Sequence, residues 1–151
     1  MFPLESNLYG RSIGKATPHR FLPGGKGGLY HWRALWQCPQ IILVEGLFDF
    51  ATLWQAGFRN VTCVLGSRPN LRQFQQLCGY RGTVYLAFDA DPNQSGQQAS
   101  AELSQRVRAQ GVNTLRVELP AGLDPNSFFV QGGDARQFRQ LLEAARLWPS
   151  M

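Results

Sequence analysis

Cysteine is scarce in this sequence. Its 151 residues include three cysteines, Cys38, Cys63 and Cys78, an odd number with no Cys-x-x-Cys pair. This pattern excludes the usual cysteine zinc site and predicts a reduced, cytoplasmic setting rather than a disulfide-bonded secreted domain. The two histidines, His19 and His31, add no metal-ligand spacing to the cysteines.

Long apolar segments are also missing. No apolar run approaches the roughly 20 residues that a membrane-spanning helix needs. The first residues, MFPLESNLYG, lack the basic-then-apolar layout of a signal peptide. We therefore expect no membrane partner. At this length one domain is the expected number, and a hydrophobic content of 44% is enough to build a core.

Acidic residues are few, and the basic excess is unevenly distributed. The chain has 10 acidic and 15 basic residues, which gives a net charge of +5. Much of the excess lies in residues 1–40, where the only acidic residue is Glu5. The segment is also rich in glycine, which indicates turns. Two interpretations stay open: a solvated leader, or a surface for a polyanion, with nucleic acid the simplest choice.

Aromatic side chains are interleaved with the basic ones in this first quarter of the chain. The combination is typical of a groove that follows a phosphate backbone and stacks bases. We therefore take Arg11, Arg20 and Lys26 as candidate contacts to nucleic acid or nucleotide. In contrast, we expect Trp32 and Trp36, which are four residues apart, to pack the segment onto the core.

From residue 40 onward, short apolar runs alternate with helical patterns. Ile41–Val44 are four consecutive apolar residues, as in a buried parallel strand. Glu45-Gly46 interrupts the run, and a helical pattern that ends at Gly57 follows. The repeated alternation predicts an α/β fold, with a mostly parallel sheet covered by helices on both faces. The other expected strands are 61–65, 83–88 and 114–119, and the other expected helices are a short one at 71–78, then 94–110 and 134–146.

The few acidic residues gather where strands end. Glu45 follows the first strand, Asp89 and Asp91 follow the third, Asp124 lies just past the fourth, and Asp49 begins the helix after Glu45. Because the carboxyl ends of parallel strands meet at one edge of a sheet, we expect these carboxylates to share a crevice. Their mutual repulsion raises their pKa values, and a divalent cation removes the conflict. Hard oxygen ligands of this kind suit Mg²⁺ or Mn²⁺, the ions of two-metal phosphoryl transfer.

Three of these acids also have a simpler interpretation. Asp49 could favour the helix N-terminus electrostatically, Asp91 could be a turn residue before a proline, and Asp124 could cap a helix with Pro125 at its first position. Glu45 is harder to account for in this way, because a glutamate directly after a buried strand costs free energy unless it is used. For each single acid, both interpretations stay open.

The same residues carry a family resemblance. Glu45-Gly46 after the first strand and Asp89-Ala90-Asp91 after the third match the pattern of the Toprim domain, which bacterial-type DNA primases, topoisomerases and some small nucleases share. The context resembles the primase branch over roughly residues 8–147. The resemblance implies a Rossmann-like parallel sheet of about four strands in residues 39–151, preceded by an irregular basic segment in residues 1–38. The similar stretches are YGRSIGKATPHRFL, VEGLFDFATLWQAGFRNVTCVLGS, FDADPNQSGQQAS and LPAGLDPNSFFVQGG.

The resemblance also implies roles for individual residues. It makes the acids after the first and third strands catalytic, namely Glu45, Asp89 and Asp91. Together with Asp49 and Asp124, these acids would bind Mg²⁺ or Mn²⁺. The basic residues named above would contact template or nucleotide phosphates.

One position departs from the primase pattern, which usually has Asp-Pro-Asp where this chain has Asp124-Pro125-Asn126. The asparagine keeps an oxygen ligand but loses a charge. The resemblance implies a module for RNA primer synthesis on single-stranded DNA from nucleoside triphosphates. It would belong to a larger protein or complex, or to a mobile element, with a replicative helicase or other replication proteins as partners. Two alternatives stay open: a metal-dependent nuclease on the same scaffold, and a non-catalytic nucleic-acid-binding module.

Overall fold

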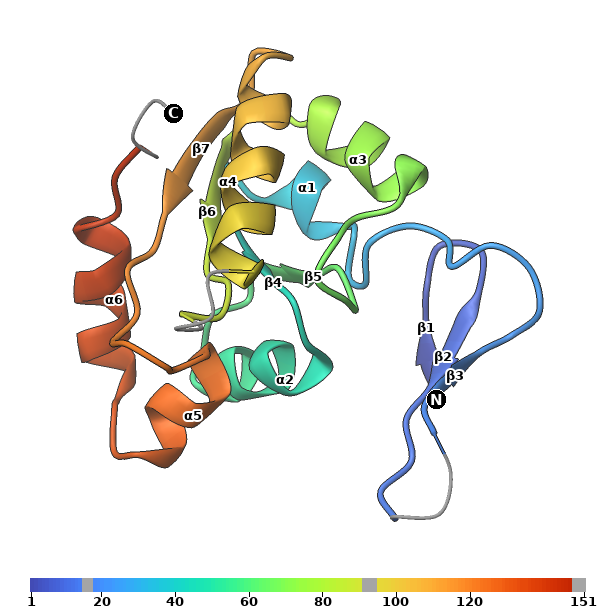
Figure 1. The fold of residues 1–151 in the computed structure, drawn as a ribbon, viewed down its shortest axis with the longest axis horizontal. Coiled ribbons are helices and arrows are strands. Elements are labelled where there is room, and N and C mark those ends of the chain that lie inside the picture. Colours follow the sequence, from blue (N-terminus) through green and yellow to red (C-terminus); the bar gives the residue numbers. More distant parts are fainter. Residues whose placement is uncertain (15–17, 91–94, 148–151) are drawn as a thin grey trace.

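The main sheet of the protein is built from four parallel strands in the order β5-β4-β6-β7. The structure is a computed structural model that describes residues 1–14, 18–90 and 95–147 (Figure 1). The strands are β4 (Gln40–Val44), β5 (Val61–Cys63), β6 (Thr83–Leu86) and β7 (Asn113–Arg116). The predicted α/β fold with a parallel sheet of about four strands is confirmed.

Helices cover both faces of this sheet. Successive side chains of a strand point to opposite faces, and the fully buried residues of β4 alternate accordingly: Ile41 and Leu43 join one core cluster, Ile42 and Val44 the other. Figure 1 shows α4 and α6 on opposite sides of β6 and β7. The first cluster includes residues of α1 (Ala34–Gln37), α3 (Leu71–Cys78) and α4 (Ser95–Arg108), and the second includes residues of α2 (Leu47–Gln55), α5 (Pro125–Val130) and α6 (Ala135–Glu143).

The basic first quarter of the chain has more regular structure than we expected. It forms a small antiparallel sheet of β1 (Phe2–Pro3), β2 (Leu8–Gly10) and β3 (Arg20–Phe21). Strands of two or three residues are too short to show an alternating pattern, so the sequence gives no signal for them. The sheet packs on the α/β body through a small apolar cluster that contains Leu4, Tyr9 and Leu47.

Buried glutamine helps to fasten the segment after this small sheet. Gln73 on α3 is fully buried, and its side-chain nitrogen donates hydrogen bonds to the carbonyl oxygens of Gly28, at 3.3 Å, and Val64, at 2.8 Å.

The expected packing of Trp36 is wrong, because its side chain is 79% exposed. Helix α1 has four residues and buries Ala34 on its core side.

Several elements end earlier than the apolar pattern suggests. β6 ends at Leu86 and β7 at Arg116, although Phe88, Val117 and Leu119 beyond them are buried. Burial therefore continues past the paired strands into the loops that lead to the sheet edge. None of the helices in the described ranges is long and apolar enough to span a bilayer.

Candidate metal centre

A cleft of about 360 Å³ lies at the carboxyl ends of the main-sheet strands. Four acidic residues from three parts of the chain line it: Glu45, Asp49, Asp89 and Asp124. The sequence predicted that these carboxylates meet at one edge of the sheet, and the structure places them there. The remaining candidate, Asp91, lies outside the described residues.

Glu45 enters the cleft directly from the end of β4. One of its carboxylate oxygens, Oε1, accepts a hydrogen bond from the backbone N–H of Asp89 at 3.3 Å. Its backbone carbonyl accepts another from Gly66 N–H at 3.0 Å. Burial, together with the nearby carboxylate of Asp89, raises the pKa of Glu45 to about 7. The end of the central strand therefore holds a carboxyl group that is costly to ionise without a cation.

Asp49 lies in the first turn of α2 and is 5% exposed. Its two carboxylate oxygens accept backbone hydrogen bonds from Gly46 N–H, at 3.2 Å, and from Asn126 N–H, at 3.0 Å. Burial outweighs these bonds and raises the pKa of Asp49 to about 7, with repulsion from Asp124 and Asp89 acting in the same direction. Asp49 thus accepts the backbone N–H at the N-terminus of α2 and also faces the cleft.

The glycine after Glu45 leaves room for this arrangement. Gly46 has ordinary extended backbone angles, with φ −108° and ψ 154°. A Cβ atom at this position would lie 2.9 Å from Asp49 Oδ2. The Glu-Gly pair therefore needs glycine for space rather than for an unusual backbone conformation.

Asp89 and Asp124 are brought together by two loops that bond to each other. Ala90 N–H donates to the Leu123 carbonyl at 3.1 Å, and Gly122 N–H donates to the Ala90 carbonyl at 2.8 Å. Asp124 also caps α5, since its Oδ1 accepts from the N–H of Ser127 at 2.6 Å and from the Ser127 hydroxyl. The helix-cap interpretation of Asp124 is therefore correct, and this residue lines the acidic cleft as well.

Three of the carboxylates have the geometry of a cation site. Asp49, Asp89 and Asp124 each offer one oxygen, and these oxygens lie within 4.8 Å of one another. Ligands of Mg²⁺ lie about 2.1 Å from the ion, so two oxygens of one site are at most about 4.2 Å apart. A small closure of the cluster would therefore bring these oxygens into coordination distance. Carboxylate oxygens are also the donors that hard divalent cations prefer, and the residues fit such an ion.

The N-terminal segment contributes positive charge to the rim of the acidic cleft through Arg11, which directly follows β2. Arg11 lines the cleft, and its guanidinium carbon lies 4.5 Å from the centre of the Phe48 ring. Arg20 is exposed on β3. Lys26 is half-buried and donates a hydrogen bond to the Leu65 carbonyl at 2.5 Å, and burial lowers the pKa of its ammonium group. Arg11 is thus at the cleft, whereas Lys26 fastens the segment to the loop after β5.

Sequence reasoning missed some residues that line the cleft, among them His19, Phe48 and Ser67. A signal for Phe48 was present, because this residue lies off the apolar face that Phe50 and Leu53 define, and its side chain is 52% exposed. His19 adjoins the basic residue Arg20, so the composition of the segment gave a weaker signal for it. Nothing in the local sequence distinguishes Ser67.

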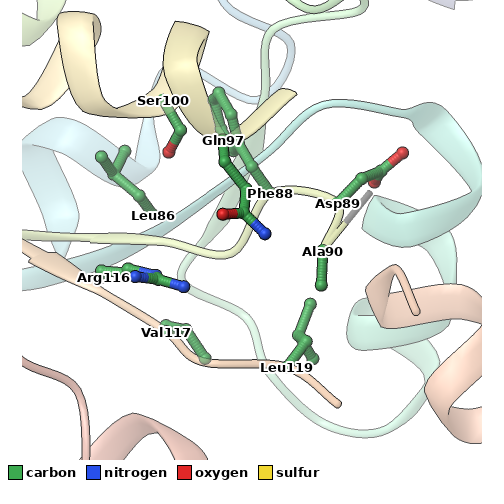
Figure 2. A pocket seen from close by; sticks show the side chains of 9 residues that line it. All are labelled: Leu86, Phe88, Asp89, Ala90, Gln97, Ser100, Arg116, Val117 and Leu119. Atoms are coloured by element: carbon green, nitrogen blue, oxygen red, sulfur yellow. The ribbon is translucent and has the colours of Figure 1, made fainter. Parts of the chain in front are cut away.

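A second, much smaller cavity lies behind Asp89, between α4, β6 and β7. Its volume is about 20 Å³, which is room for a single water molecule. Figure 2 shows the Arg116 guanidinium and the Gln97 amide pointing toward one another, while the Asp89 carboxyl points away from them. Asp89 lines both this cavity and the acidic cleft, so the loop after β6 is shared by the two.

Comparison with known families agrees with this geometry. A family model described as the Toprim domain matches residues 40–135. The chain belongs to the Toprim family. Toprim domains bind divalent metal ions, in agreement with the acidic cluster of Asp49, Asp89 and Asp124.

Curated relatives of this Toprim domain include DNA primases. The DNA primase of Aquifex aeolicus is 33% identical over 104 residues, which are 69% of this chain and 20% of that protein. A crystal structure of the zinc-binding and RNA polymerase domains of the Aquifex aeolicus primase has a TM-score of 0.76 at 27% identity, covering 92% of this chain and 36% of that one. A structure of the DnaG primase catalytic domain bound to single-stranded DNA has a TM-score of 0.74 at 22% identity, covering 93% and 48%. The chain therefore spans about a fifth of the length of the curated Aquifex relative.

Proposed function

We propose that this Toprim domain is the metal-binding part of a primase-like nucleotidyltransferase, which extends RNA primers on single-stranded DNA from nucleoside triphosphates. The observation that carries the proposal is the meeting of four carboxylates in one cleft, with Arg11 at its rim. The similarity to DNA primases supports the reaction class. The related DnaG catalytic domain bound to single-stranded DNA supports the choice of polymer.

The acidic residues would hold Mg²⁺ or Mn²⁺. Asp49, Asp89 and Asp124 offer the three oxygens that already lie within 4.8 Å of one another, and Glu45 lies beside Asp89. Asp91, two positions after Asp89, completes the set that we propose. When bound, the cation would neutralise phosphate charge and help to activate the primer 3′-hydroxyl. The protein's own part is to hold these carboxylates at fixed positions and to exclude water from Asp49, which is 5% exposed.

The N-terminal segment, residues 1–38, would hold the polyanion against the Toprim part, residues 39–151. Arg11 stands over the Phe48 ring at the mouth of the acidic cleft, where a nucleotide phosphate would need a counter-charge. Arg20 is exposed on β3 of the small N-terminal sheet and would meet the template backbone. Lys26 would act mainly by fixing the segment in place through the Leu65 carbonyl. A replicative helicase or other replication proteins as partners, and a cytoplasmic location, stay predictions from the sequence.

The direct test is template-dependent ribonucleotide incorporation on a primed single strand by the intact enzyme that contains this domain, with Mg²⁺ and with Mn²⁺. Wild type is compared with E45Q and D89N, and E143Q serves as a control because Glu143 is exposed on α6. We expect incorporation by wild type and E143Q and loss in the other two variants. Equal incorporation in all four proteins would contradict the proposal. The same reactions separate the alternatives, since shortened substrate would indicate a nuclease, and salt-sensitive binding without turnover would indicate a binding module.

A further inference from the structure

Asn126 occupies an unusual place between two helices of the site. It is the second residue of α5, and its side-chain oxygen, Oδ1, accepts a hydrogen bond from the Thr52 hydroxyl at 2.8 Å. Its backbone N–H donates to Asp49 Oδ1 at 3.0 Å. Thr52 and Asp49 are three residues apart on α2, so they lie on the same side of that helix. Asn126 therefore joins α5 to α2 twice, once through its backbone and once through its side chain.

These two bonds set the relative position of two acidic residues. Asp124 caps α5 two residues before Asn126, and Asp49 accepts the Asn126 N–H. Asp124 is held near Asp89 separately, by the backbone hydrogen bonds that join Ala90 to Gly122 and Leu123. Asp124 is thus connected to Asp49 through Asn126 and to Asp89 through the backbone of Ala90. These two connections fix the three oxygens that lie within 4.8 Å of one another. The Thr52–Asn126 bond belongs to the connection with Asp49.

We propose that Thr52 and Asn126 form a latch that positions Asp49 and Asp124 for a divalent cation, with Asn126 acting as a positioning residue rather than as a ligand. The inference rests on the proposed metal-binding function of the site. The Asn126 oxygen is uncharged and already accepts the Thr52 hydroxyl, which makes it a weaker cation ligand than a carboxylate. Asn126 therefore lacks the charge of the aspartate that the primase pattern has at this position, but its side chain has a structural role.

The test is the Mn²⁺ affinity of the protein, measured by isothermal titration calorimetry without nucleotide or DNA. T52V removes the hydroxyl donor, and N126A removes the acceptor but keeps the backbone N–H that bonds to Asp49. Outer-shell partners of metal ligands are worth about 10–100-fold in affinity, so each single variant is expected to raise the Mn²⁺ dissociation constant about tenfold. The double variant is expected to raise it about tenfold as well, because both changes break the same bond. T52S restores a hydroxyl donor and is expected to bind like wild type.

Thr83, on β6 of the main sheet, offers a matched control for Thr52. Its hydroxyl oxygen accepts a hydrogen bond from the Asn113 side chain at 3.1 Å, and the pair is exposed. Thr83 is the first residue of β6, at the opposite edge of the sheet from the cleft. T83V therefore removes another Thr–Asn side-chain hydrogen bond, one in which the threonine accepts, without touching the acidic cluster, and its Mn²⁺ affinity is expected to match that of wild type.

Each other outcome overturns a definite part of the inference. If Asn126 is itself a ligand, N126A will weaken binding while T52V does not, or the two losses will multiply in the double variant. If T52V binds Mn²⁺ as tightly as wild type, the latch is wrong, while the metal site and the proposed function stand. If wild type binds no Mn²⁺, both the latch and the proposed function fail.

Discussion

In the absence of a divalent cation, the folded protein should lose stability as the pH rises, because of the buried carboxyl group of Asp49. Burial raises the pKa of this group from 3.8 to about 7 in the folded chain. A carboxyl group with a raised pKa binds its proton more tightly in the folded than in the unfolded state. The contribution of this carboxyl group to the stability of the folded state is therefore fully present below pH 3.8 and is lost as the pH rises through about 7.

The size of this effect follows from the two pKa values. One pKa unit corresponds to ~1.36 kcal/mol, so the whole difference for Asp49 is about 4 kcal/mol. Between pH 5 and pH 8 the linkage relation gives a loss of about 3 kcal/mol in the free energy of unfolding. Glu45, with its pKa also raised to about 7, adds to the loss by a smaller amount, because more of its carboxyl group contacts water.

Urea denaturation in EDTA at pH 5, 6, 7 and 8 measures this loss. For a denaturant slope of about 2 kcal/mol per molar urea, the midpoint should fall by about 1–2 M across the range. D49N removes the titrating group, so its midpoint should vary much less with pH. E143Q, a change at an exposed carboxyl group on α6, should retain the wild-type profile.

Adding Mg²⁺ should reverse the loss at high pH. The cation binds the ionised carboxylates, so it stabilises the folded state increasingly as the pH rises and releases protons when it binds. At pH 8, the midpoint in excess Mg²⁺ should exceed that in EDTA, and at pH 5 the two should be close. A wild-type profile in EDTA that is flat between pH 5 and pH 8, or that matches the profile of D49N, would refute the reasoning about the buried Asp49.

Four further substitutions, at Gln73, at the Ser104–Thr114 pair and at Gly46, test the support of the fold and of the site. Q73L removes the hydrogen bonds of a fully buried side chain to two backbone carbonyls, so it should lower the free energy of unfolding by about 3 kcal/mol in urea denaturation; a loss under half of that would contradict this assignment. Ser104 and Thr114 share a buried hydrogen bond of 2.7 Å, so S104A alone should cost about 1–3 kcal/mol, and adding T114V should cost little more. Additive losses would mean that the two hydroxyls act independently. G46A places a Cβ atom 2.9 Å from Asp49 Oδ2 and should weaken Mn²⁺ binding about tenfold in calorimetry; unchanged affinity would show that this carboxylate moves at no cost.

Much of the main sheet was predictable because β4 is apolar throughout its interior. Ile41–Val44 are fully buried, and a short, uninterrupted apolar run of this kind is typical of a parallel strand that is covered on both faces. The meeting of Glu45, Asp89 and Asp124 at one sheet edge was predictable for the same reason, since parallel strands all end at that edge.

The contacts between loops and the small N-terminal sheet were not predictable from local patterns. The Asp49–Asn126 hydrogen bond joins residues 77 positions apart, and no periodicity in either segment encodes it. The strands of the N-terminal sheet have two or three residues, so a period of two cannot be recognised in them. The packing of Trp36 was mispredicted because spacing alone does not show that α1 ends after four residues.

The position of each strand in the sheet gives the acidic residues unequal support. Glu45 follows β4, which is paired with a strand on both sides, whereas Asp124 comes after β7, which is last in the strand order and pairs with β6. Local opening begins where fewest hydrogen bonds must break, so we expect the end of the chain from β7 onward to open at a lower free energy than β4. Such partial opening would carry Asp124 away and abolish ion coordination in a molecule that is otherwise folded. Amide hydrogen exchange in this part of the chain would then slow as the ion concentration increases.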